Sequence, residues 1–152
     1  MNVIIYSENA KNNLEEVLIM SGDYMVRSFG VDDIQNYKEV NPSVMVFDMP
    51  LDKVKEQCAV TKFDAGVLIV VDEIPEDLTV RAESFDFIKR PVNNIELTTR
   101  IDSLGKVMKY RNNLKTIAVT DELTGLYNRK YLHSRLDAEI SNTKRYGTSL
   151  SC

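Results

Sequence analysis

Short apolar runs recur through the first two thirds of the chain, separated by segments of mixed polarity. Three runs, 3–6, 44–47 and 67–71, are apolar at every position, which is typical of central strands buried on both faces of a sheet. The run 85–88 contains one polar residue, and the run 24–29 alternates in the manner of a strand near a sheet edge. The pattern therefore predicts five strands.

The segments between these runs carry apolar residues three and four positions apart, the spacing of a helix that buries one face. Pro75, whose fixed φ suits the first turn of a helix, precedes the shortest segment, which contains Leu78 and Ala82. Strands that alternate with helices form parallel sheets with right-handed crossovers. We therefore predict a doubly wound α/β domain of five strands and five helices.

After Pro91 the pattern changes to one long helix, with a stripe of residues at alternating spacings of four and three. Such a stripe is the seam of a coiled coil, although Gly105 weakens it. We expect the helix to pack on its own sheet as far as Ile101 and then to project and pair with a second copy of the chain. The alternative is that the whole stripe packs on the sheet. The predicted seam consists of Leu97, Ile101, Leu104, Met108 and Arg111.

Composition narrows the classes of function. The 152 residues include 19 basic and 23 acidic side chains, a formal charge of −4, which offers no electrostatic attraction for nucleic acid. No apolar run approaches the roughly 20 residues that span a bilayer, so no membrane partner is expected. Cys58 and Cys152 are too few for a disulfide framework, and the single histidine, His133, argues against His-based catalysis or a zinc cage. We expect a cytoplasmic protein.

Polar residues follow the predicted strands at their carboxyl ends, where open parallel sheets bind ligands. Carboxylates that lie close together repel one another unless a cation lies between them. Mg²⁺ is the plausible cation, because it binds one or two carboxylates together with water and phosphate. The alternative is an ordinary solvated rim of loops. The residues at these ends are Ser7, Glu8, Asn9, Asp48, Asp72, Glu73, Lys89 and Arg90.

The segments VMVFDMP (44–50) and FDFIKRP (85–91) resemble the third and fifth strands of receiver domains in bacterial two-component response regulators. The resemblance implies a flavodoxin-like sheet in the order 2-1-3-4-5. It also implies that Asp48 accepts a phosphoryl group from a sensor histidine kinase, with Mg²⁺ held by Glu8 and Asp48.

Several positions depart from that family's pattern. Val71 stands where a Thr or Ser bonds the phosphoryl group, and Arg90 stands where a Lys pairs with it, with Lys89 one residue earlier. Ser7 replaces an acid, while Phe87 matches the aromatic residue that moves in the family's switch. We therefore predict a degenerate receiver that is regulated without phosphate; the alternative is a phosphorylation-competent receiver of a two-component system.

The segment 121–132, DELTGLYNRKYL, resembles the opening of GGDEF diguanylate cyclase domains, D-x-L-T-G-L-x-N-R. Physically it is a turn into a helix, with Asn128 as N-cap and a helix from about residue 128 to 146. The residues that hold GTP and metal in that family lie farther along, so we expect no enzyme in this chain and a cyclase in a longer parent. The motif positions are Asp121, Leu123, Thr124, Gly125, Leu126, Asn128 and Arg129.

The expected organisation is a receiver-like domain at 1–104, a linker helix at 105–120 and the beginning of a GGDEF domain at 121–152. The predicted function is signal transduction: an input domain that regulates cyclic di-GMP synthesis by setting the geometry of a dimer. The open alternatives are a stand-alone phosphorelay receiver, a regulatory module of a cyclic di-GMP receptor with an inactive GGDEF domain, and an enzyme in its own right.

Overall fold

The computed structural model describes residues 1–8, 13–30, 34, 37–76, 78–121, 123–147 and 149. The chain divides into two compact units, Met1–Lys109 and Tyr110–Cys152. Within the described residues, no helix combines the length and the hydropathy needed to cross a bilayer.

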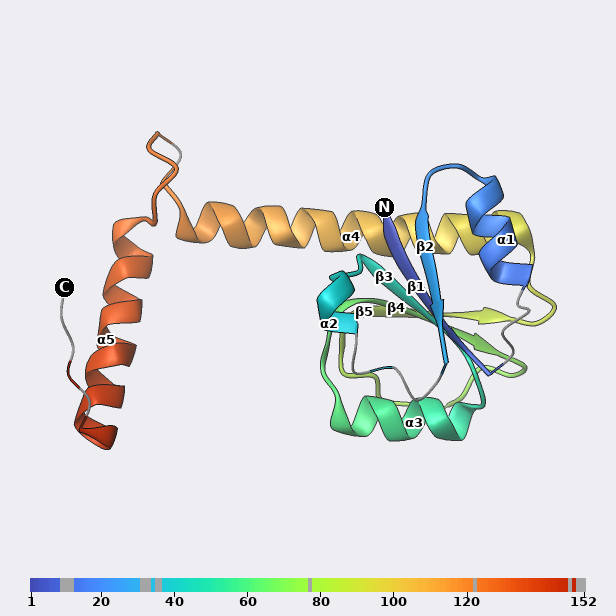
Figure 1. The fold of residues 1–152 in the computed structure, drawn as a ribbon, viewed down its shortest axis with the longest axis horizontal. Coiled ribbons are helices and arrows are strands. Elements are labelled where there is room, and N and C mark those ends of the chain that lie inside the picture. Colours follow the sequence, from blue (N-terminus) through green and yellow to red (C-terminus); the bar gives the residue numbers. More distant parts are fainter. Residues whose placement is uncertain are drawn as a thin grey trace. The chain divides into compact units, whose positions relative to one another are not determined.

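The first unit is built on a sheet of five parallel strands in the order β2-β1-β3-β4-β5, which confirms the predicted fold class (Figure 1). The register sets Ser7 beside Asp48 and Val71 beside Lys89, so the strands finish at one edge of the sheet. The strands are β1 (Asn2–Ser7), β2 (Met25–Phe29), β3 (Val44–Asp48), β4 (Phe63–Val71) and β5 (Ala82–Lys89).

Helices cover both faces of this sheet, as the continuously apolar strands require. Along β1, Ile4 and Tyr6 belong to one buried cluster, whereas Val3 and Ile5 belong to the other. Helices α2 (Tyr37–Val40) and α3 (Leu51–Val60) contribute to the first cluster. Helices α1 (Asn13–Met20) and α4 (Asn94–Val119) contribute to the second (Figure 1).

The prediction of a helix after Pro75 is wrong. Residues 78–81 have no helical structure, and Ala82 already belongs to β5. Val80 is only 8% exposed, because its side chain packs in the first buried cluster. The β-branched pair Thr79 and Val80 favours such an extended path over a helix. The described part of the first unit therefore has four helices.

Helix α4 packs on its own sheet as far as Ile101, as expected, but the prediction that it projects from there on is wrong for Leu104 and Met108. Leu97 and Ile101 are fully buried, and Leu104 and Met108 are 5% and 4% exposed. The physical reason lies in β4, which begins at Phe63, before the predicted run, and includes Gly66.

A Cβ on Gly66 would lie 3.0 Å from the Cβ of Leu104 and 3.6 Å from the Cγ of Met108, so this glycine makes room for the helix. Gly105 has a similar role, since a Cβ there would collide with the sulfur of Met1. The stripe thus packs on the chain's own sheet as far as Met108. Arg111, the last predicted member, lies in the second unit and is half-buried.

The second unit contains the end of α4, a turn and helix α5 (Arg129–Tyr146). The side chain of Asn128 accepts a hydrogen bond from the N–H of Tyr131 at 2.9 Å, which confirms the predicted N-cap. Gly147 ends the helix with a φ of 66°, a left-handed conformation that glycine adopts without strain.

Candidate functional site

A strand-end pocket of about 790 Å³ opens at the carboxyl ends of β1, β3, β4 and β5. β1, β3 and β4 are apolar over their last buried residues, so the polar residues that follow fall at this edge. Of the residues predicted there, Lys89 is not part of the lining, and Asn9 lies outside the described residues. The pocket is lined by Ser7, Glu8, Asp48, Met49, Pro50, Leu51, Val70, Val71, Asp72, Glu73 and Arg90.

Arg90 is the central side chain of this pocket. Its Nη2 donates a hydrogen bond to Oδ1 of Asp48, and its Nη1 donates to Oδ1 of Asp72 at 3.3 Å. Its backbone N–H donates to the carbonyl of Val71 at 2.9 Å, which holds the residue at the end of β4. Ser7 completes the group, since its Oγ donates to Oδ2 of Asp48 at 3.4 Å.

The electrostatics of the pocket favour the charged form of Arg90. Burial lowers the pKa of the guanidinium, but its hydrogen bonds and charge interactions with Asp48 and Asp72 outweigh that effect and raise the pKa above its ordinary value. The Asp48 side chain is 17% exposed and that of Asp72 is 83% exposed. The bond to Asp48 is therefore the better shielded of the two.

Glu8 has a cationic partner of its own. The Nζ of Lys53, in the first turn of α3, lies 2.5 Å from Oε1 of Glu8, and both side chains are more than 40% exposed. Lys53 is not among the residues predicted from the sequence. The signal that could have found it is its place in the helix that starts directly after Asp48-Met49-Pro50, at the same edge of the sheet.

The arrangement does not fit the metal that the family resemblance implies. Glu8 and Asp48, the predicted ligands, are each paired with a cation of the chain itself. Within the described part of the chain, no group of three or more His, Cys, Asp or Glu side chains is placed to hold a metal ion. Mg²⁺ therefore stays a prediction from the sequence, without support from the geometry.

Of two further predicted residues, Val71 lines the strand-end pocket and Phe87 does not. Val71 is 4% exposed and lines the pocket, where its side chain offers no hydrogen-bond donor. Phe87 does not line it; the ring packs against the first core cluster and lies edge-on to Phe85, with ring centres 5.8 Å apart.

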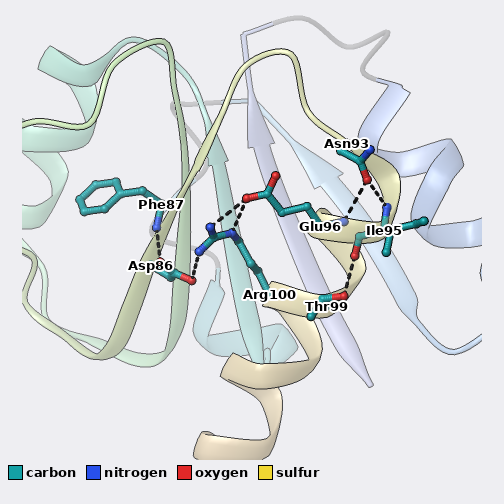
Figure 2. A network of polar contacts seen from close by, with 7 residues as sticks. All are labelled: Asp86, Phe87, Asn93, Ile95, Glu96, Thr99 and Arg100. Carbon is teal, nitrogen blue, oxygen red and sulfur yellow. Dashed lines mark hydrogen bonds and ion pairs between the residues drawn. The ribbon is translucent and has the colours of Figure 1, made fainter.

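A second polar network, which we call the Arg100 network, joins β5 to α4 (Figure 2). Nη1 of Arg100 lies 2.6 Å from Oδ2 of Asp86, and its Nη2 lies 2.8 Å from Oε1 of Glu96. These bonds raise the pKa of Arg100, first through Asp86 and then through Glu96. Asn93 caps the helix, accepting from the N–H groups of Ile95 and Glu96 at 2.9 and 3.2 Å.

The Arg100 network was not predicted from the sequence. Its signals were an acid inside the otherwise apolar run 85–88 and the four-residue spacing of Glu96 and Arg100. The network fixes the start of α4 to the strand that ends at the pocket.

In the second unit, the described residues 120, 121 and 123–128 form a compact turn, which we call the opening turn. Oδ1 of Asp121 accepts hydrogen bonds from the N–H of Leu123 at 3.2 Å and from the N–H and Oγ1 of Thr124 at 3.0 and 2.9 Å. These bonds, above all that of the Thr124 hydroxyl, lower the pKa of Asp121. Gly125 has a φ of 69°, which explains why the turn needs glycine there.

Asn128 joins the opening turn to both helices. Its Nδ2 donates to the carbonyl of Ala118 at 2.9 Å, and its backbone N–H donates to that of Val119 at 2.8 Å. Thr120 and Tyr127 form an isolated antiparallel bridge beside it. The polar motif residues thus build the turn, whereas Leu123 and Leu126 are 94% and 70% exposed. Arg129 begins α5, with its Nε 3.4 Å from Nε2 of His133.

Comparison with known proteins finds a similarity over part of the chain. No family model matches the chain. Over 95 residues the chain is 34% identical to response regulator PleD of Caulobacter vibrioides, in strain NA1000 / CB15N and equally in strain ATCC 19089 / CIP 103742 / CB 15. The aligned part covers 56% of this chain and 21% of each relative, so the chain spans about a fifth of the length of these curated relatives. The similarity and the five-stranded parallel sheet support a receiver-like domain.

Proposed function

We propose that this chain is the regulatory input part of a response regulator whose output is a diguanylate cyclase domain. The observation that carries the proposal is the opening turn: every position of the cyclase motif is filled, and the polar ones bond to one another and to the ends of α4 and α5. In this proposal the chain is not itself the enzyme, and cyclic di-GMP is made by the domain that follows.

Helix α4 is the element through which the input acts. It begins in the receiver-like unit, where Asp86 holds Arg100, and it ends at the carbonyls that Asn128 binds. Because α4 is one continuous helix, a shift or rotation at its start moves its end as well. Joining two GTP molecules requires two cyclase active sites to meet, so the helix would control how two copies approach.

The surface for that encounter is the part of α4 in the second unit. Tyr110, Leu114 and Ile117 are 67%, 67% and 57% exposed and follow one another at spacings of four and three. We propose that a homodimer forms there instead of on the buried stripe. Leu114→Glu should lower the dimer fraction in sedimentation velocity, while Lys115→Glu should leave it; equal effects of both variants would contradict this surface.

The regulation that fits the strand-end pocket is independent of phosphate. Asp48 is already bonded by Arg90 and Ser7, and Val71 offers no donor to a phosphoryl group. Phosphorylation by a sensor histidine kinase remains the alternative that the family resemblance provides.

A fusion experiment tests the proposed output. The chain is followed by an active GGDEF catalytic domain, and cyclic di-GMP formation is measured after insertion of two or seven residues between Asn112 and Asn113. Two residues rotate the end of α4 by about 200°, seven by about −20°. We expect the first insertion to lower the rate about tenfold and the second to preserve it. Control through α4 would be contradicted if the two insertions gave equal rates of cyclic di-GMP formation. It would also be contradicted if the fusion without an insertion were no different in rate from the catalytic domain alone.

A further inference from the structure

The strand-end pocket holds more acids than cations, and its cations are already bound. Glu8, Asp48, Asp72 and Glu73 line it, while Arg90 lies among them. Arg90 pairs with Asp48 and Asp72, and Lys53 pairs with Glu8 from α3. The side chains of Asp48 and Glu8 are 17% and 41% exposed, and both have a cation of the chain itself as partner.

The Arg90 guanidinium also has the geometry of a bridging ion. Its two terminal nitrogens bond oxygens that come from the ends of β3 and β4, while its own backbone continues β5. A charged fork of this kind makes strong hydrogen bonds to carboxylates. A divalent cation that used Oδ1 of Asp48 as ligand would have to compete with this fork for the same oxygen, and the two positive charges would repel each other. Ser7, which also bonds Asp48, could provide such a cation only with a neutral hydroxyl oxygen.

We propose that Arg90 is the resident cation of the strand-end pocket, and that the pocket is for this reason indifferent to divalent metal ions. The guanidinium ties the ends of three strands together permanently, whereas a bound metal would do so only when present. Removing the guanidinium takes away the cation that Asp48 and Asp72 share, and their carboxylates can then act as ligands of a small cation such as Mg²⁺. This inference does not rest on the proposed function.

Thermal unfolding with and without MgCl₂, at matched ionic strength, tests the proposal on the whole chain. At about 10 mM MgCl₂, the wild type should show no shift of Tm, and Arg90→Gln should gain about 3 °C. Adding Asp48→Asn to Arg90→Gln should abolish that gain. Lys89→Gln is the matched control, because it removes a positive charge from the preceding residue, which does not line the pocket; it should behave as wild type.

Calorimetric titration with MgCl₂ provides a second readout. The proposal would be overturned if the wild-type chain gave a saturable heat of Mg²⁺ binding and Asp48→Asn abolished that heat. It would also be overturned if Arg90→Gln showed no binding of Mg²⁺. Should Arg90→Gln fail to fold, Arg90→Lys takes its place, because an ammonium keeps the charge but cannot bridge both carboxylates as a planar fork does. The expected gain is then smaller but still dependent on Asp48.

Discussion

The strand-end pocket and the opening turn are both organised around an aspartate, yet the two aspartates are held by different means. Asp48 is bound by Ser7 and Arg90, which lie 41 and 42 residues away in the chain, and its main partner is a charge. Asp121 is bound by Leu123 and Thr124, within three residues, through neutral N–H and O–H donors.

This difference has a consequence for how each region responds to change. The pocket depends on the whole sheet and on opposite charges, so it is vulnerable to charge reversal. The opening turn depends on a short stretch of chain and on backbone bonds, so it is vulnerable to loss of one polar side chain. Substitutions can therefore separate the two regions.

The largest expected effect is that of Arg90→Glu, which sets a third acid beside Asp48 and Asp72. We expect the free energy of unfolding of the first unit to fall by about 2 kcal/mol, a value reduced because Arg90 is 39% exposed. Urea denaturation measures it. Lys89→Glu serves as control and should cost less than about 0.5 kcal/mol. If both reversals cost the same, the pocket has no special dependence on Arg90.

A smaller effect is expected from Asn128→Ala in the opening turn. The substitution removes the N-cap of α5 and the bond to the carbonyl of Ala118, at a cost of about 1 kcal/mol. Hydrogen exchange at the first turn of α5 should speed up about fivefold, with strand amides unchanged. Asn142→Ala, within the same helix, is the comparison variant and should slow exchange slightly, because alanine favours helices.

A pH effect confined to the opening turn is expected from Asp121. Its pKa in the folded chain lies below the unfolded value, so the bonds to Leu123 and Thr124 are fully present above the ordinary carboxyl pKa and are lost as pH falls through the lowered one. Amide exchange of Thr124, corrected for intrinsic rates, should therefore rise in acid. The same profile in Asp121→Asn would show that another group titrates.

The smallest effect is expected from acetyl phosphate with Mg²⁺, which should leave the mass of the wild-type chain unchanged. Asp48 is bonded by Arg90, and Val71 provides no donor for a phosphoryl group. A phosphoryl mass gain that disappears in Asp48→Ala would contradict phosphate-independent regulation and restore the alternative of a working receiver.

The same contrast in sequence distance explains what sequence analysis could and could not predict. The opening turn and the cap of Asn128 are local, so a motif of nine residues was sufficient to place them. The central strands were predictable because residues such as Val44 to Phe47 are apolar without interruption. The resemblance supplied the strand order, which the apolar pattern leaves open.

Long-range packing was not predictable in the same way. The burial of Leu104 and Met108 depends on Gly66, in a part of β4 that begins before the obvious apolar run. Spacing alone could not decide whether their stripe faces the sheet or another chain. The gathering of Asp48, Asp72 and Arg90 was expected, but the Lys53 and Arg100 pairs were not, because each joins elements whose register only the fold defines.

The bond within the Arg100 network between the Phe87 N–H and Oδ1 of Asp86, at 2.8 Å, has one more consequence. Strand β5 is the last in the sheet, and Phe85 on it is 43% exposed. Outer strands of this kind invite intermolecular β-pairing and aggregation. Asp86 acts as a gatekeeper against such growth, since it occupies a backbone donor and places a charged side chain in the most apolar stretch of the strand.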